Sequence, residues 1–168
     1  MKWIGISGSW RKTNRELEKD VRKTAREIIN RGDGIISGGA LNVDYFATRE
    51  AMKLDPKVEK IKIFLPTPLK IYSQHYCNRA NEGIITKNQA RELIKQLLRL
   101  QKINRGALIE NNLQEVNDSA YDERNSAVIN ASDELIAFWV NQSEGTRNTI
   151  EKAKEKGIPI KIHKYTIK

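Results

Sequence analysis

Cysteine and long apolar runs are both scarce in this chain. The 168 residues include one cysteine, Cys77, which cannot form an internal disulfide and is typical of a protein of the reducing cytoplasm. No apolar run approaches the roughly 18 residues of a membrane span. The opening residues, MKWIGISGSW, lack the apolar region and cleavage site of a signal peptide. We therefore expect a cytoplasmic protein with no membrane partner.

Metal-binding and phosphate-loop motifs are also missing. The two histidines, His75 and His163, lie far apart, and no Cys/His cluster has metal-ligand spacing. We therefore expect no metal and no other cofactor. The sequence contains neither the dinucleotide fingerprint G-x-G-x-x-G nor the phosphate loop G-x-x-x-x-G-K-[ST]. Phosphoryl transfer of the kinase or ATPase type therefore has no support.

Acidic residues are outnumbered by basic ones. The chain has 30 Lys and Arg against 21 Asp and Glu, a formal net charge of +9. This excess suits a phosphate ligand, a nucleic acid or a membrane surface, and an ordinary solvated basic surface gives the same balance. With 39% hydrophobic and 30% charged residues, the composition is that of a globular protein, and the length suits one domain, residues 1–168.

Short apolar runs alternate with longer amphipathic ones. We expect buried strands at 3–6, 34–36, 61–65, 135–140 and 158–162. A helix is expected after the first strand, from a capping box with Thr13 as N-cap to a stop at Gly32. Further helices are expected near 43–54, 119–131 and 145–156. The alternation predicts an α/β fold with an open parallel sheet and helices on both faces.

Residues 66–118 interrupt this pattern. Residues 71–83 are polar, aromatic and irregular. They contain a dense cluster that serves either as a lid or base-stacking surface or as a packed loop that fixes the insertion: Tyr72, His75, Tyr76, Asn78 and Arg79. A second capping box at 86–89 then precedes an apolar stripe that predicts a helix. We interpret the segment as a helical insertion after the third strand. The basic residues at 87–102 either contact the phosphates of a nucleic acid or form a solvated helix face.

Three of the expected strands end in turns rich in glycine and hydroxyl residues. These are Ser7-Gly8-Ser9-Trp10, the turn 37–42 and the turn 141–146, and each leads into a helix. The carboxyl ends of parallel strands meet at one sheet edge, where such folds bind ligands. Helix N-termini present unpaired N–H groups, and glycine lets the backbone approach an anion. One such turn is explained by sterics, but three at one edge predict a phosphate or nucleotide site.

Together these turns resemble the SLOG superfamily, which includes LOG-type phosphoribohydrolases, DprA-type DNA-processing proteins and nucleotide sensors. The resemblance covers the chain except residues 66–118. The matching segments are Gly5–Ser9, Ile36–Ala40 with Asp44, Tyr121 with Arg124-Asn125, Asp133–Phe138, Gly145-Thr146, Ala153 and Gly157–Pro159. The resemblance implies a Rossmann-like fold that binds a nucleotide or related phosphate, and a homodimer.

The resemblance also implies roles for the matching residues. Ser7, Gly8 and Ser9 would line the ribose or base side of the ligand. Gly38, Gly39, Gly145 and Thr146 would hold phosphate, and Arg124 would pair with it. Asp44 would meet a ribose hydroxyl. Ala40 and Asn125 complete the implied ligand site.

Two departures from the family pattern affect the functional hypothesis. Asn42 stands where the second motif usually has glycine, and Asn148-Thr149 replaces the acidic pair of the LOG enzymes. We therefore favour a nucleotide-binding protein, such as a sensor, over an enzyme. The second hypothesis is cleavage of a nucleotide N-glycosidic bond, with Arg124 and Glu144 as candidate catalytic residues and Glu123 as another possible acid. The third is DprA-like DNA binding, supported by the net charge.

Overall fold

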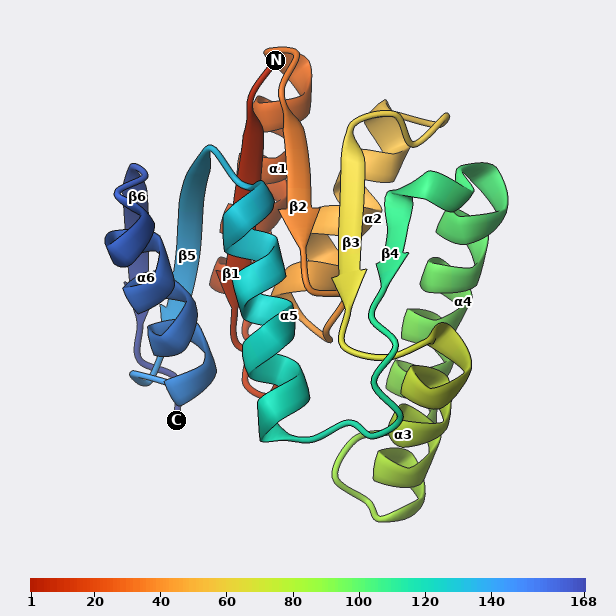
Figure 1. The fold of residues 1–168 in the computed structure, drawn as a ribbon. Helices are drawn as coiled ribbons and strands as arrows, with labels where there is room; N and C mark the ends of the chain where they lie inside the picture. The colour runs from red at the N-terminus through yellow and green to blue at the C-terminus, as the bar shows by residue number, and fades with distance from the viewer.

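A single parallel sheet of six strands organises residues 1–168 of the computed structural model, in the order β4-β3-β2-β1-β5-β6 (Figure 1). The strands are β1 (Trp3–Gly8), β2 (Gly34–Ser37), β3 (Ile61–Leu65), β4 (Leu108–Glu110), β5 (Glu134–Val140) and β6 (Ile160–Tyr165). The chain builds outward from β1 to β4, then crosses back to place β5 on the other side of β1. The strand order therefore switches between β1 and β5.

Six α-helices pack around the sheet. They are α1 (Arg15–Asn30), α2 (Val43–Leu54), α3 (Leu69–Asn81), α4 (Lys87–Ile103), α5 (Asp118–Ala131) and α6 (Glu144–Lys156). Helices α5 and α6 lie on one face, and α1 and α2 lie on the other (Figure 1). Strand β5 shows the two-sided burial: Leu135 and Ala137 pack with α5 and α6, whereas Phe138 joins the larger core with α1. The predicted Rossmann-like α/β fold is confirmed, and none of these helices has both the length and the apolarity needed to cross a membrane.

The segment 66–118 is more closely built into the sheet than the sequence suggested. The helix after the second capping box is present as α4, with that box formed by Thr86 and Gln89. Residues 71–83 were wrongly expected to be irregular, because most of them form α3. Strand β4 was not predicted at all, since three residues are too short to give an apolar pattern. It pairs with β3, so this segment supplies the sheet edge as well as two helices.

The start of α1 also differs from the prediction. Asn14, not Thr13, is the N-cap, and its Oδ1 accepts the Leu17 N–H at 2.8 Å. Both residue types suit a cap, but Asn14 has the extended backbone (φ −147°, ψ 179°) that leads into the first turn. The glutamate three residues after Thr13 therefore does not form a capping box.

Candidate ligand site at the strand switch

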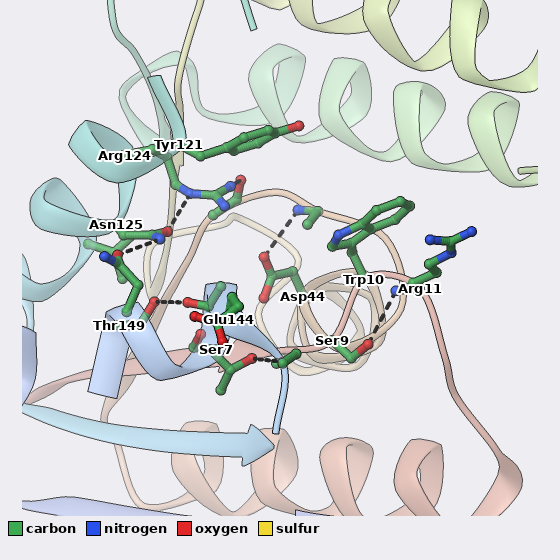
Figure 2. Close-up of a pocket in the computed structure, with 18 of the residues that line it drawn as sticks. Ser7, Ser9, Trp10, Arg11, Asp44, Tyr121, Arg124, Asn125, Glu144 and Thr149 are labelled. Carbon is green, nitrogen blue, oxygen red and sulfur yellow. Dashed lines mark hydrogen bonds between the residues drawn. The ribbon is translucent and has the colours of Figure 1, made fainter. Parts of the chain in front are cut away.

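A cavity of about 1020 Å³ opens at the carboxyl edge of the sheet, where the strand order switches. Its walls come from the turns after β1, β2 and β5 and from side chains of α3 and α5. Figure 2 shows these side chains gathered around one hollow. The three glycine- and hydroxyl-rich turns therefore meet at one place, as open α/β sheets bring them together.

Every predicted ligand residue except Gly39 lines this cavity. The lining residues from that set are Ser7, Gly8, Ser9, Gly38, Ala40, Asp44, Arg124, Asn125, Gly145 and Thr146. Gly39 instead faces the core, where a Cβ would lie 2.8 Å from the Leu65 side chain. Its backbone has φ +68°, and its carbonyl accepts the Tyr72 hydroxyl at 2.9 Å. Gly39 therefore does not line the cavity, because the turn needs this glycine for its own packing.

Arg124 is held over the second turn by its own hydrogen bonds. Nη1 donates to the Gly38 carbonyl at 2.5 Å, and Nε donates to Asn125 Oδ1 at 3.0 Å. The guanidinium carbon lies 5.1 Å from the centroid of the Tyr121 ring. A Cβ on Gly38 would overlap the guanidinium itself. Glycine at position 38 therefore makes room for a preoriented arginine in the cavity wall.

Asp44 is a buried carboxylate with one free oxygen. Its Oδ2 accepts the Ala40 N–H at 3.1 Å, while Oδ1 is buried with no hydrogen-bond partner. Burial raises the pKa of Asp44, and the nearby Arg124 charge and the N–H groups of Ala40 and Gly38 oppose this rise. The carboxylate therefore places an acceptor of the protein's own in the turn after β2, at the Ala40 N–H. Its other oxygen remains an unused acceptor in a residue of the cavity wall.

The N-terminus of α6 has no such internal partner. Ser143 is its N-cap but makes no side-chain cap hydrogen bond, and its hydroxyl instead lies 3.1 Å from Thr146 Oγ1. A Cβ on Gly145 would meet no atom within 4 Å. An uncapped helix start presents free N–H groups and a partial positive charge. Of the turns predicted to bind an anion, this one keeps the most room for it.

At the positions where the resemblance to LOG enzymes implies an acidic pair, the cavity wall carries Asn148 and Thr149. Asn148 Oδ1 accepts from Asn125 at 3.1 Å, and Asn148 Nδ2 donates to Asp122 at 3.0 Å. Glu144 sits at the cavity rim with its side chain 88% exposed, 3.7 Å from Arg147. Glu123 accepts from Asn111 at 2.9 Å and does not line the cavity. Neither glutamate has the buried setting that tunes a general acid.

Helix α3 brings residues to the cavity that were not among the predicted ligand residues. His75, Tyr76 and Arg79 line it, whereas Tyr72 lies in the core. The His75 Nε2 lies 3.4 Å from the Tyr121 hydroxyl, and burial, with the Arg79 charge, lowers the pKa of His75. The dense aromatic cluster after the third strand was the available signal, but its helical spacing was not recognised. No group of three His, Cys, Asp or Glu side chains is arranged to hold a metal ion.

Several solved structures have a fold similar to that of this chain. No protein-family model and no curated protein matches the sequence. DNA processing protein A from Helicobacter pylori, described for its single-stranded DNA binding mode, matches with a TM-score of 0.68 and 21% identity over 96% of this chain. The molybdenum cofactor binding protein from Rippkaea orientalis matches with a TM-score of 0.63 and 18% identity, covering 97% of this chain and 76% of its own. DprA from Streptococcus pneumoniae matches with a TM-score of 0.63 and 16% identity over 96% of this chain.

These neighbours and this chain share a Rossmann-like α/β fold. The chain spans only 64% of the Helicobacter protein and 50% of the Streptococcus protein. At these identities the likeness concerns architecture alone.

Proposed function

We propose that this protein binds a nucleotide or a nucleotide derivative in the cavity at the strand switch. The observation that carries the proposal is one cavity that combines a preoriented guanidinium, an uncapped helix N-terminus and a buried carboxylate with a free oxygen. The first two attract phosphate, and the third accepts a hydrogen bond from a hydroxyl or amine. A phosphorylated sugar carries both kinds of group.

Phosphate belongs at α6 rather than at α2 in this proposal. The turn before α2 already receives the Asp44 carboxylate, so a second anion there would be repelled. At α6, Gly145 leaves open space and Ser143 and Thr146 offer hydroxyls. The Arg124 guanidinium keeps N–H groups beyond the two that bind Gly38 and Asn125. These remaining donors are available to the same ligand.

The sugar belongs beside Asp44 and the turn after β1. Ionised Asp44 offers its free Oδ1 to a ribose hydroxyl. Ser7 and Ser9, from the turn after β1, line the same cavity as Asp44. Ser9 Oγ already accepts from the Arg11 and Lys12 N–H groups at 3.3 and 3.2 Å. That hydroxyl therefore has its own proton free to donate.

Single-stranded DNA is the second candidate ligand. The net charge of +9 and the likeness to the Helicobacter DNA processing protein favour it. The exposed basic residues of α4 (Lys87, Arg91, Lys95 and Arg99) do not line the cavity. A DNA strand that used both regions would bind with an affinity that falls steeply with salt. The cytoplasmic location and the homodimer remain predictions from the sequence.

The test is calorimetric titration of the four ribonucleoside 5′-monophosphates, with native mass spectrometry of the gently purified protein to identify any retained ligand. We expect saturable binding with one ligand per chain, markedly weakened in Arg124→Ala. The matched control is Arg99→Ala, which removes the same charge from an exposed position of α4 outside the cavity. No binding by the parent protein, or equal weakening by both variants, would contradict the proposal. Release of free base during the titration would instead favour the hydrolase hypothesis.

A further inference from the structure

One aromatic side chain of the cavity wall is left open to solvent. Trp10 lines the cavity and is 41% exposed, whereas Tyr76 is 5% exposed. Removal of an aromatic ring from water is favourable, and contact with a second aromatic ring adds to that stabilisation. An indole exposed in a ligand cavity is therefore a surface on which a planar group can stack.

The loop that carries Trp10 is tied down on both sides. Asn42 Nδ2 donates to the Trp10 carbonyl at 2.6 Å. The preceding residue, Ser9, accepts two backbone N–H groups of the same loop. A platform that is already fixed loses little conformational entropy when a ligand binds to it.

The residue that ties the loop has an unusual backbone. Asn42 has φ 61° and ψ −106°, in a region that favours glycine and costs other residues about 1–3 kcal/mol. Glycine would adopt this conformation freely but has no amide to offer to Trp10. Asparagine here therefore exchanges backbone strain for the hydrogen bond that fixes the Trp10 loop.

The position of Trp10 places it away from the phosphate end. In Figure 2 the Trp10 side chain lies on the opposite side of Asp44 from Asn125 and Thr149. Tyr121 and His75 also line the cavity, and the Arg11 guanidinium lies 6.0 Å from the centroid of the indole. A ligand with its phosphate at α6 and its sugar at Asp44 would extend its remaining group toward these rings.

We propose that Trp10 is the stacking platform for a planar heteroaromatic ring of the ligand, such as a nucleobase, and that Asn42 is its positioning residue. This inference rests on the proposed function for the direction in which the ligand lies. The inference adds stacking on Trp10 as a separate source of ligand affinity. It also explains the strained backbone of Asn42 by the hydrogen bond that fixes the Trp10 loop.

The experiment separates the ring from the phosphate. Calorimetry would compare ribonucleoside 5′-monophosphates, the corresponding nucleosides and ribose 5-phosphate on the parent protein and on Trp10→Ala, Trp10→Phe and Asn42→Gly. We expect Trp10→Ala to weaken mononucleotide binding by roughly 5- to 150-fold, the range for one base stacked on an aromatic ring. Ribose 5-phosphate should bind to it as to the parent protein, and Trp10→Phe should keep most of the affinity. Trp3→Phe is the control, since Trp3 lies at the start of β1, outside the cavity.

Asn42→Gly tests the positioning role. It should fold at least as stably as the parent protein in urea melts and still lose several-fold in mononucleotide affinity, with no further loss in the Trp10→Ala background. Equal mononucleotide affinity in the parent protein and Trp10→Ala would overturn the platform while phosphate binding stood. If no phosphate compound bound at all, the proposed function would fail. In that case, nucleosides would be tested for quenching of Trp10 fluorescence, with Trp10→Phe as the reference. Absence of quenching would overturn the platform too.

Discussion

Replacement of Arg124 is the most direct test of how the cavity works. The guanidinium lies in the cavity wall with two of its donors engaged by Gly38 and Asn125. Those two bonds hold the fork in place, so a ligand phosphate meets a donor group that needs no reorganisation. A charge-assisted hydrogen bond contributes about 1.5–3 kcal/mol. Arg124→Ala should therefore weaken mononucleotide binding by roughly 10- to 150-fold.

The same substitution also changes the charge balance around Asp44. The Arg124 charge opposes the rise that burial causes in the pKa of Asp44. Without it, that pKa rises further, and a larger fraction of the protein carries a neutral Asp44 at a given pH. Because a neutral carboxyl accepts less strongly, the affinity of Arg124→Ala should fall more steeply as the pH is lowered than that of the parent protein.

Calorimetry at several pH values measures both effects, and Arg124→Lys keeps the charge while it removes the planar fork. We expect Arg124→Lys to lie between the parent protein and Arg124→Ala in affinity and to keep the parent pH dependence. Urea melts of each variant separate lost binding from lost folding. An affinity of Arg124→Ala within twofold of the parent value would refute the reasoning and remove Arg124 from the ligand site.

Three further substitutions test neighbouring parts of the site. Gly38→Val should displace the guanidinium, because its side chain would overlap Arg124, and should add no loss to Arg124→Ala in a calorimetric double-mutant cycle. The raised pKa of Asp44 means that its ionisation destabilises the fold, so the free energy of unfolding falls as the pH rises through that pKa. Asp44→Asn should therefore be more stable than the parent protein at pH 7 in urea melts, and its stability should depend less on pH above the ordinary value of 3.8. The same variant should bind ribose compounds more weakly. The methyl group of Gly145→Ala would enter open space at the start of α6, so this variant should fold normally in thermal melts. It should lose about 1 kcal/mol of mononucleotide affinity, because the methyl group stands where phosphate would approach. Unchanged affinity would place the phosphate elsewhere.

Much of the fold was predictable because its signals are local. The strands next to the switch have continuous apolar runs, and α4 has both its apolar stripe and its capping box. Strand β4 was missed because it has three residues, and its place depends on pairing with β3 rather than on its own composition. Helix α3 was missed because its polar residues mask the two tyrosines that face the core, Tyr72 and Tyr76.

The candidate site was predictable at the level of turns but not of individual glycines. Gly38 and Gly39 are adjacent and were given one role from the sequence. In the structure a Cβ on Gly38 would overlap Arg124, whereas one on Gly39 would press on Leu65 in the core. The residue type is the same because both positions lack room for a side chain. Which neighbour takes that room depends on the tertiary structure and leaves no trace in the local sequence.

The three turns look alike in sequence but differ in what they leave available. The turn after β1 carries an exposed indole, fixed by a strained Asn42 from the next turn. The turn after β2 is satisfied by its own carboxylate, so it attracts donors rather than anions. Only the turn before α6 combines an uncapped helix start with open space at its glycine, the combination that the sequence suggested for all three. The cavity is therefore polarised, and a ligand with an anion at one end, hydroxyls in the middle and a flat ring at the other end matches it in one orientation.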